Sequence, residues 1–265
     1  MKKRGFLGMV VASALLLLTS CLGDSNNQQT LSSIPGVIST SKDYKTIIKT
    51  AAGAAIYSPS LETAGYLPGQ CVLASFTIDF DAAENANAAS NGYYYATMNA
   101  VPDNVDRWYA NPIMGDTTKL LDKEQAVTSP IDTRYGAAYL EGMLFLFSDF
   151  THLTKQESNW YLSYDGNQTA VEENGKRIYS VFLRATIKTE GQTPSLNSVV
   201  VNAFDAKTMI DGFNTKEKDL GNKEYYIKIN YIKEIDAKDP TKFTWTSTDP
   251  TWMKLSVPAD NTTGK

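Results

Sequence analysis

The sequence is poor in the residues that build metal cages and disulfide scaffolds. Its 265 residues include one histidine and two cysteines, too few for a Cys/His zinc site or a disulfide framework. An excess of basic residues is also missing, because 25 Lys and Arg are outweighed by 29 Asp and Glu. The resulting net charge of −4 argues against a dedicated nucleic-acid-binding protein. The composition indicates no metal and no other cofactor.

Long apolar runs are missing after the first twenty residues. The N-terminus has Lys2, Lys3 and Arg4, followed by an uncharged apolar run over residues 5–18. This run fits the core of a signal peptide and is short for a membrane span, which needs about 20 residues. It ends in Leu18-Thr19-Ser20-Cys21, which resembles the bacterial lipobox. The resemblance implies cleavage before Cys21 and lipid attachment to its thiol, so we predict a lipoprotein signal peptide over residues 1–20. The alternative is an ordinary secreted protein with a chance cysteine near its cleavage site.

Lipid attachment at Cys21 would make the membrane the first partner of this chain. Cleavage would remove three basic residues and leave 22 basic against 29 acidic residues, a net charge of −7. Anionic lipids repel such a body, so its attachment would depend on the acyl chains. Leu22 follows the cysteine in place of Asp, and under the lipoprotein sorting rule that this resembles, the outer membrane is favoured. The periplasmic and the surface-exposed side of that membrane both stay open.

The mature chain is predicted to be all-β, with a polar leader and two domains. Residues 21–40 are rich in Asn, Gln, Ser and Thr and are predicted to form a lipidated, flexible tether. Apolar and polar residues then alternate with period two in several segments, among them 72–80, 179–188 and 225–231. We expect a small OB-like β-barrel over residues 41–120 and an antiparallel β-sandwich over residues 121–265. No long amphipathic helix is expected, and a helical turn competes only at residues 206–213.

One further stretch suggests a family. A lipobox, a polar tether and the sequence Gly65-Tyr66-Leu67-Pro68-Gly69-Gln70-Cys71-Val72-Leu73, followed by a second all-β half, resemble the NigD-like lipoproteins of Bacteroides and its relatives. That resemblance implies an N-terminal OB-like barrel and a C-terminal β-sandwich, and it brings no catalytic residues. Cys71 stands where the family pattern leads us to expect a basic residue. The alternative is another Bacteroides surface lipoprotein of similar size.

Catalytic chemistry finds little support in the sequence. The single histidine, His152, lacks the Gly-x-Ser-x-Gly elbow of a serine hydrolase and fits a loop position after a buried strand. Asp79 and Asp81 share one face of a strand, as the paired carboxylates of glycosidases can, but they equally fit a strand that ends in solvent. We therefore assign no catalytic residue and no metal ligand, and we predict that the chain is not an enzyme.

Aromatic residues offer better candidates for binding. Fifteen Tyr and four Trp are many for this length, and Trp108-Tyr109 lies among Asn and Asp residues. Exposed rings of this kind stack on sugars or anchor protein partners, whereas ordinary core packing is the simpler alternative. Trp108 and Tyr109 are the candidate ligand-binding residues. Asp116-Thr117-Thr118 resembles a short O-glycosylation signal, which makes Thr117 the candidate modification site.

These observations support three functions, in a fixed order. The first is a non-catalytic cell-envelope lipoprotein that acts as a binding or structural module, with a glycan or an envelope protein as partner. The second is a carbohydrate-binding component of a glycan-uptake system, and the third is a carboxylate-dependent hydrolase.

Cys71 would remain as the single cysteine of the mature chain after lipidation of Cys21. We expect it to be a buried free thiol, because it opens a strand whose inner face is apolar.

Overall fold

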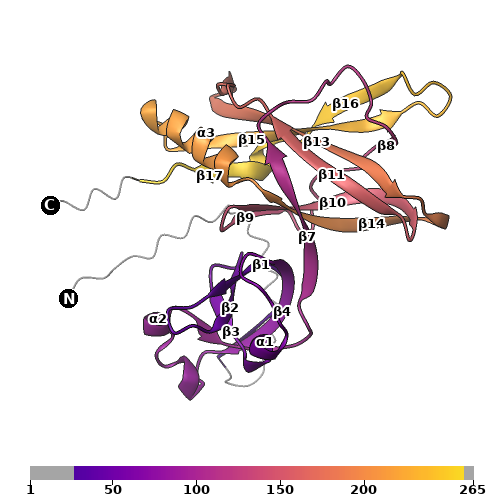
Figure 1. Cartoon of the computed structure of the whole chain (residues 1–265). Helices are drawn as coiled ribbons and strands as arrows, with labels where there is room; N and C mark the ends of the chain where they lie inside the picture. Colours follow the sequence, from indigo (N-terminus) through magenta and orange to yellow (C-terminus); the bar gives the residue numbers. More distant parts are fainter. Residues whose placement is uncertain (1–26, 260–265) are drawn as a thin grey trace.

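The computed structural model describes residues 27–259, so Cys21 and the predicted signal peptide lie outside the described residues. Figure 1 shows two bodies, a smaller N-terminal one and a larger C-terminal one, joined by strand β7. Strands dominate both bodies, as the period-two alternation predicts, and the all-β expectation is confirmed.

The N-terminal body is a small barrel. Its elements are β1 (Gln28–Thr40), β2 (Thr46–Thr50), β3 (Ala55–Tyr57), α1 (Pro59–Thr63), β4 (Cys71–Asp79), η1 (Ala83–Asn85), α2 (Ala88–Asn91), β5 (Tyr94–Tyr95) and β6 (Thr97–Met98). The barrel closes because β1 pairs with both β2 and β4, β2 pairs with β3, β3 pairs with β5, and β6 pairs back onto β4. Alternate residues of these strands fill its interior with a core of Ile38, Ile48, Ile56, Leu61, Val72, Ala74, Phe76 and Ile78.

Strand β1 corrects one expectation from the sequence. We expected a tether over residues 21–40, but residues 28–40 are a strand of the barrel. The first half of β1 pairs with β4, and a bulge between Leu31 and Ile34 bends the strand so that its second half also reaches β2. Gly36 allows this close packing, because a Cβ there would lie 2.4 Å from Cγ2 of Ile48. The polar residues of this segment face solvent on one side of a strand, which is why the sequence reads as a tether.

The C-terminal body is a two-layered sandwich. The first layer, here the β10 sheet, contains β9 (Ala137–Leu140), β10 (Met143–Thr154), β14 (Gln192–Asp205) and part of β7 (Asp103–Asn111). The second layer, here the β13 sheet, contains β8 (Glu124–Gln125), β11 (Glu157–Tyr164), β12 (Val171–Glu173), β13 (Lys176–Thr189), β15 (Glu224–Ile235), β16 (Phe243–Ser247) and β17 (Lys254–Ser256). A short helical turn, η2 (Pro250–Met253), precedes β17.

Two features of the sandwich differ from the antiparallel pattern that we expected. Strand β7 pairs in parallel with both β14 and β11, and β13 pairs in parallel with β15. A parallel pair needs a long crossover connection, and here β14 and the helix α3 (Lys207–Asp219) connect β13 to β15. The sequence indicated only a competing helical turn at residues 206–213. Its mostly polar residues hide the amphipathic pattern, and Met209, Ile210 and Phe213 alone bury the helix against the sandwich core.

Helix α3 is also held by a buried carboxylate. Glu217 is fully buried and accepts hydrogen bonds from Arg177 at 2.5 and 3.0 Å, from Tyr179 at 2.7 Å and from Asn222 at 2.6 Å. Burial alone would raise the pKa of this carboxyl, but the donated hydrogen bonds outweigh it and leave the pKa below its usual range. Burying the carboxylate of Glu217 without partners would destabilise the fold. With Arg177 and Tyr179 of β13 as donors, the same carboxylate holds the helix α3 against β13.

Strand β7 also moves the expected domain boundary. We expected the boundary near residue 120, but β7 leaves the barrel after Val105, which pairs with Cys71 of β4, and Asp106 already pairs with β14. The two bodies share a third apolar cluster, the interdomain cluster, in which Val37 and Cys71 of the barrel pack with Met143, Phe145, Phe147 and Ala203 of the β10 sheet. Cys71 is a free cysteine and is 3% exposed, so the expected buried thiol is confirmed.

Candidate functional site

Strand β7 closes only part of the open side of the sandwich. Residues 106–109 pair with β14 of the β10 sheet, and residues 110 and 111 pair with β11 of the β13 sheet. The strand therefore crosses from one layer to the other and joins them along that stretch. Beyond Asp106 the chain turns away to the barrel, and β14 and β11 are no longer bridged. A cleft opens between the layers at this point.

The cleft, here called the Trp108 cleft, has a volume of about 420 Å³ and is lined by side chains of five strands. Its size falls in the range of small-ligand and side-chain pockets. Phe150 of β10 and Trp160 of β11 are buried against each other, edge to face, with ring centroids 4.9 Å apart. Trp108 of β7 and Val200 of β14 line it from the closed side. The cleft thus combines aromatic and aliphatic walls with a polar rim.

Asn202 supplies the one unsatisfied polar group of the cleft among the described residues. The indole Nε1 of Trp108 donates a hydrogen bond of 2.9 Å to Oδ1 of Asn202. Nδ2 of the same amide has no partner, although Asn202 is only 2% exposed. An unpaired buried donor costs about 1–3 kcal/mol, and such groups are rare enough in native proteins to need an explanation. A ligand with an acceptor oxygen in the Trp108 cleft would satisfy it.

The charged and titratable side chains that line the cleft have partners within the chain, except for Asp106, which is exposed at the rim. Lys188 pairs with Glu157 at 3.0 Å, and Arg107 pairs with Asp205 at 2.6 Å. Both ring nitrogens of His152 are also engaged, Nδ1 with the carbonyl of Leu153 and Nε2 with the hydroxyl of Ser198, each at 2.9 Å. The Nδ1 contact requires an N–H donor, which fixes the ring orientation and makes His152 a structural residue here. These pairings favour an uncharged ligand.

Trp108 and Tyr109 do not share a site. Successive side chains of a strand point to opposite faces. Trp108 packs against the sandwich core on the cleft side, whereas Tyr109 is 73% exposed on the outer face, with the Arg107 guanidinium 5.8 Å from its ring. On the neighbouring strand β11, Tyr161 is also exposed and follows the same register, since Leu162 pairs with Ala110. The outer face therefore carries two neighbouring tyrosines, and the cleft carries Trp108.

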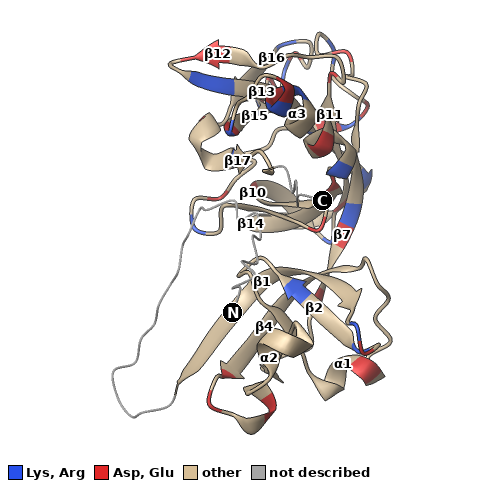
Figure 2. Cartoon of the chain, turned by 90° about the vertical axis from the view of Figure 1, so that its left-hand side faces the viewer, with Lys and Arg blue, Asp and Glu red and all other residues tan. Residues whose placement is uncertain are grey.

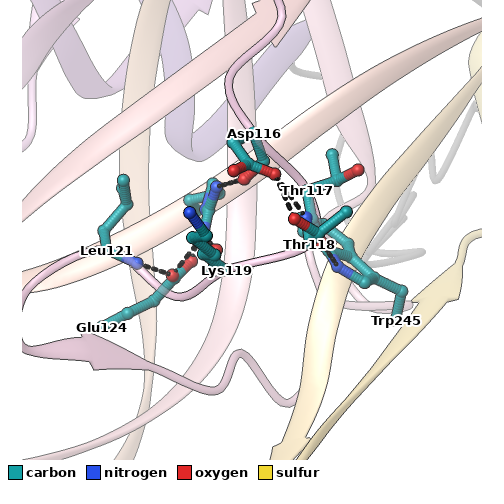
Figure 3. A network of polar contacts seen from close by, with 8 residues as sticks. Asp116, Thr117, Thr118, Lys119, Leu121, Glu124 and Trp245 are labelled. Atoms are coloured by element: carbon teal, nitrogen blue, oxygen red, sulfur yellow. Dashed lines mark hydrogen bonds and ion pairs between the residues drawn. The ribbon is translucent and has the colours of Figure 1, made fainter. Parts of the chain in front are cut away.

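Thr117 lies on a loop that is clamped to the β13 sheet, as Figure 3 shows. The carboxylate of Asp116 accepts hydrogen bonds from the backbone N–H and the hydroxyl of Thr118 at 2.8 and 2.6 Å. The carbonyl of Thr117 accepts a bond of 3.0 Å from the indole of Trp245. Asp116 and Trp245 hold the loop through Thr118 and the carbonyl of Thr117. The hydroxyl of Thr117 takes part in none of the contacts drawn.

The candidate carboxylate Asp79 serves a turn, and so does Asp165. Asp79 accepts a hydrogen bond from Gln28 at 2.9 Å and another from the backbone N–H of Asp81 at 3.0 Å, at the exposed end of β4. Asp165 accepts from the backbone N–H of Asn167 at 2.8 Å, which is the geometry of an Asx turn. Within residues 27–259 no group of His, Cys, Asp and Glu side chains is placed to hold a metal ion. These carboxylates border neither of the two cavities described here.

A second cavity of about 510 Å³ lies between residues 118–124 and the hairpin of β15 and β16. Its walls include Leu120, Leu121, Ile235 and Phe243. None of the unpartnered buried side-chain atoms of residues 27–259 belongs to its lining. The Trp108 cleft is the stronger candidate site, because there aromatic walls and an unsatisfied donor occur together.

The sequence singled out Trp108 but missed the residues that complete the cleft. Trp160 lies in a strand pattern that is typical of a core position, and Asn202 lies without a signal of its own in a run of apolar residues. Both come to Trp108 through the crossing of β7, with separations of 52 and 94 residues along the chain. A sequence pattern cannot show such long-range pairing. The surplus of aromatic residues was the only indication.

Charged residues of both signs occur along the chain in both bodies, as the coloured ribbon of Figure 2 shows. Within the described part of the chain, no helix is both long and apolar enough to cross a membrane.

Comparison with known proteins finds a family that is similar to the barrel. Residues 26–102 match the family described as the lipoprotein OB domain. A protein without an assigned function from Parabacteroides merdae is 27% identical, with a TM-score of 0.76 over 86% of this chain and 100% of that one. A protein named as a lipoprotein from Bacteroides fragilis is 10% identical, with a TM-score of 0.56 over 87% of this chain and 99% of that one. A NigD-like immunity protein from Bacteroides caccae is 10% identical, with a TM-score of 0.43 over 84% and 94% of the two chains.

The family match confirms the OB-like barrel that the resemblance implied, because residues 26–102 match the lipoprotein OB domain. No curated protein matches the sequence. The matched family is one of lipoproteins, which are proteins attached to membranes. Nothing in the related proteins indicates catalysis.

Proposed function

We propose that the chain is a non-catalytic binding module of the cell envelope, anchored to the outer membrane by lipid on Cys21, and that the Trp108 cleft is its ligand site. The observation that carries the binding role is the unpartnered Nδ2 of Asn202 beside the aromatic walls of the cleft. A folded chain tolerates such a group where a ligand completes its hydrogen bonding. The lipoprotein family of the barrel supports the anchor.

The anchor is tested by metabolic labelling with a palmitate analogue and by membrane fractionation. Wild-type protein is expected to take up label and to resist extraction with carbonate, and Cys21→Ser is expected to take up none. The acyl chains supply the attachment, at about 0.8 kcal/mol for each buried methylene. An unlabelled wild-type protein that carbonate removes from membranes would refute the anchor and leave the proposal for the cleft untouched.

The cleft is tested by screening the detergent-solubilised full chain against two probe sets. One set is a panel of neutral oligosaccharides, and the other is a library of random 12-residue peptides displayed on phage. The variant Trp108→Phe keeps an aromatic ring and removes the indole N–H that holds Asn202. Trp245→Phe is the matched control, because its indole also donates to the protein, to the carbonyl of Thr117, away from the cleft. We expect a ligand whose affinity falls at least tenfold in Trp108→Phe and less than twofold in Trp245→Phe. Failure of both probe sets to yield such a ligand would overturn the proposed site.

The outer face supports a second candidate function, carbohydrate binding. Tyr109 and Tyr161 expose their rings on adjacent parallel strands, and sugars stack on exposed rings of this kind. Retention of the protein on a polysaccharide column that is lost in Tyr109→Ala and kept in Trp108→Phe would favour this function.

A further inference from the structure

The strand β14 is hydrogen-bonded on both sides for only part of its length. Its whole length pairs with β10, from Gln192 to Asp205. On its other side, β7 pairs with residues 202–205 only. Residues 195–201 therefore form an open sheet edge, here called the β14 edge. An open edge of this length is a template for pairing with another strand.

Contacts of β10 show which backbone groups face the β14 edge. Asp149 exchanges backbone hydrogen bonds with Ser129, and the carbonyl of Phe147 accepts one from Asp132. Backbone groups of Asp149 and Phe147 thus point away from β14, which makes their partners, Val199 and Val201, members of non-hydrogen-bonded pairs. The N–H and C=O groups of Val199 and Val201 consequently point outward. The carbonyl of Val201 faces the backbone N–H of Asp106, where the parallel ladder with β7 begins. The N–H of Val201 and both backbone groups of Val199 have no partner among the described residues.

The β14 edge adjoins the Trp108 cleft. Side chains alternate along β14, so Val200 and Asn202 face the cleft, and Val199 and Val201 face the interdomain cluster. The cleft is the opening between the two layers that β7 leaves unbridged after it crosses. A strand added to the β14 edge would continue the position that β7 occupies, close this opening and direct alternate side chains into the cleft.

We infer that the β14 edge binds an extended polypeptide segment of a partner protein by strand addition, with alternate uncharged side chains entering the Trp108 cleft. The inference rests on the proposed function, since it takes the cleft as the ligand site and names the ligand class. Three observations select a polypeptide. The unpaired groups are a repeating backbone pattern, and the existing ladder of β7 on β14 shows the same pairing. The charged side chains Arg107, Glu157 and Lys188 at the rim are already paired. Seven residues of edge accommodate about 23 Å of extended chain.

Strand addition predicts a specific effect of proline. The N–H of Val199 faces the edge, so Val199→Pro removes one edge donor without removing a hydrogen bond to β10. Proline is tolerated at edge positions whose N–H faces solvent. Val199→Ala is the matched control, since it truncates the same side chain and keeps the N–H. The probes are peptides selected from the random 12-residue phage library on the full chain, measured by fluorescence anisotropy.

The expected result is a loss of peptide affinity of at least tenfold in Val199→Pro and of less than threefold in Val199→Ala. The same peptides with alternate amides N-methylated should also lose at least tenfold, which keeps the test valid if Val199→Pro fails to fold. Hydrogen exchange at Val199 and Val201 should slow at least tenfold in the complex. Equal affinity of the methylated and unmethylated peptides would overturn the inference.

Other outcomes separate this inference from the proposed function. An oligosaccharide that binds in a Trp108-dependent manner, with affinity unaffected by Val199→Pro, would refute the polypeptide and support the cleft. Absence of any cleft-dependent ligand would refute both. Concentration-dependent dimers in sedimentation that Val199→Pro abolishes would identify a second copy of this chain as the occupant and overturn the partner segment.

Discussion

The guanidinium of Arg184 and the carboxylate of Glu124 form a two-pronged ion pair, with Nε–Oε1 at 2.6 Å and Nη2–Oε2 at 2.5 Å. The two side chains are only 5% and 0% exposed. The remaining donors of Arg184 bind the carbonyls of Asp116 and Lys119 at 2.9 and 2.6 Å. One buried cation thus fastens the loop that follows β7 to the β13 sheet.

Glu124→Gln should destabilise the protein by about 3 kcal/mol. The change removes the negative charge and leaves the Arg184 guanidinium buried without a counterion, which typically costs about 3–5 kcal/mol. The two carbonyls that still bind Arg184 place the expected loss at the lower end. Urea unfolding, followed by tryptophan fluorescence, measures the difference. Glu190→Gln is the control, because its partner Lys123 and Glu190 itself are 51% and 63% exposed, and such pairs contribute about 1 kcal/mol or less. Equal losses in the two variants would contradict a buried pair that holds the loop.

Cys71 should resist thiol reagents in the native protein. Its side chain lies in the interdomain cluster, and burial raises the pKa of the thiol to about 11. Both effects suppress the thiolate that reacts. We expect labelling by an aromatic disulfide at pH 8 to be at least a hundredfold slower in buffer than in 6 M guanidinium chloride. Rapid labelling of the native chain would show that the two bodies separate.

The same thiol should contribute to the pH dependence of stability. An unfolded cysteine has a pKa of about 8.5, below the folded value of about 11. Because the folded value is raised, the contribution is fully present below about pH 8.5 and is lost as the pH rises toward 11. Urea midpoints of wild type should therefore fall more steeply between pH 8.5 and 11 than those of Cys71→Ala. Parallel slopes for the two proteins would exclude this contribution.

Local pattern was enough to predict the strands β4, β13 and β15 and the buried position of Cys71. Strand β4 is the clearest case, because its strict alternation places Val72, Ala74 and Phe76 in the barrel core. Period-two patterns persist through tertiary folding wherever one face of a strand is buried.

Long-range pairing accounts for what the sequence did not show. Strand β1 has a polar face that resembles a tether, and only its pairing with β4, whose partner residues lie 34 to 51 positions further along the chain, makes it a strand. The helix α3 depends on Glu217, whose burial is compatible with its charge only because Arg177 and Tyr179 reach it from β13. In the same way, Trp108 was identified by its chemistry, but its partner Asn202 comes from the crossing of β7 between the layers. Composition can identify candidate residues such as Trp108, but the strand topology determines which other residues they contact.

Thr117 should carry a glycan when the protein is isolated from its native cells. Its loop is clamped by Trp245 and Asp116, and its hydroxyl lies outside that network. Intact-mass spectrometry of the wild-type protein should show added hexose-type mass that is absent from Thr117→Ala. Thr251→Ala is the control for an engaged hydroxyl, because Asp249 accepts bonds from the N–H and hydroxyl of Thr251 as Asp116 does from those of Thr118. An unmodified wild-type mass, or a mass unchanged in Thr117→Ala, would refute the assignment.

Phe145 should couple the unfolding of the two bodies. Its ring is fully buried on β10 and packs in the cluster that also contains Val37 and Cys71 of the barrel. Phe145→Ala is expected to cost about 3–5 kcal/mol, the range for removing a buried phenyl ring. Because that cavity opens in the contact between the bodies, scanning calorimetry should show one cooperative transition in wild type and two in the variant.

The matched control for this coupling is Phe76→Ala. Phe76 is equally buried, but it belongs to the barrel core alone, so its loss should weaken the barrel without removing contacts between the bodies. If the interdomain cluster couples the barrel to the sandwich, Phe76→Ala should lower the thermal unfolding midpoint by a similar amount and keep a single transition. If Phe145→Ala instead unfolds in one transition with the midpoint of Phe76→Ala, the interdomain cluster stabilises each body separately. The strand β7, which pairs with both bodies, would then be what makes the chain unfold as one unit.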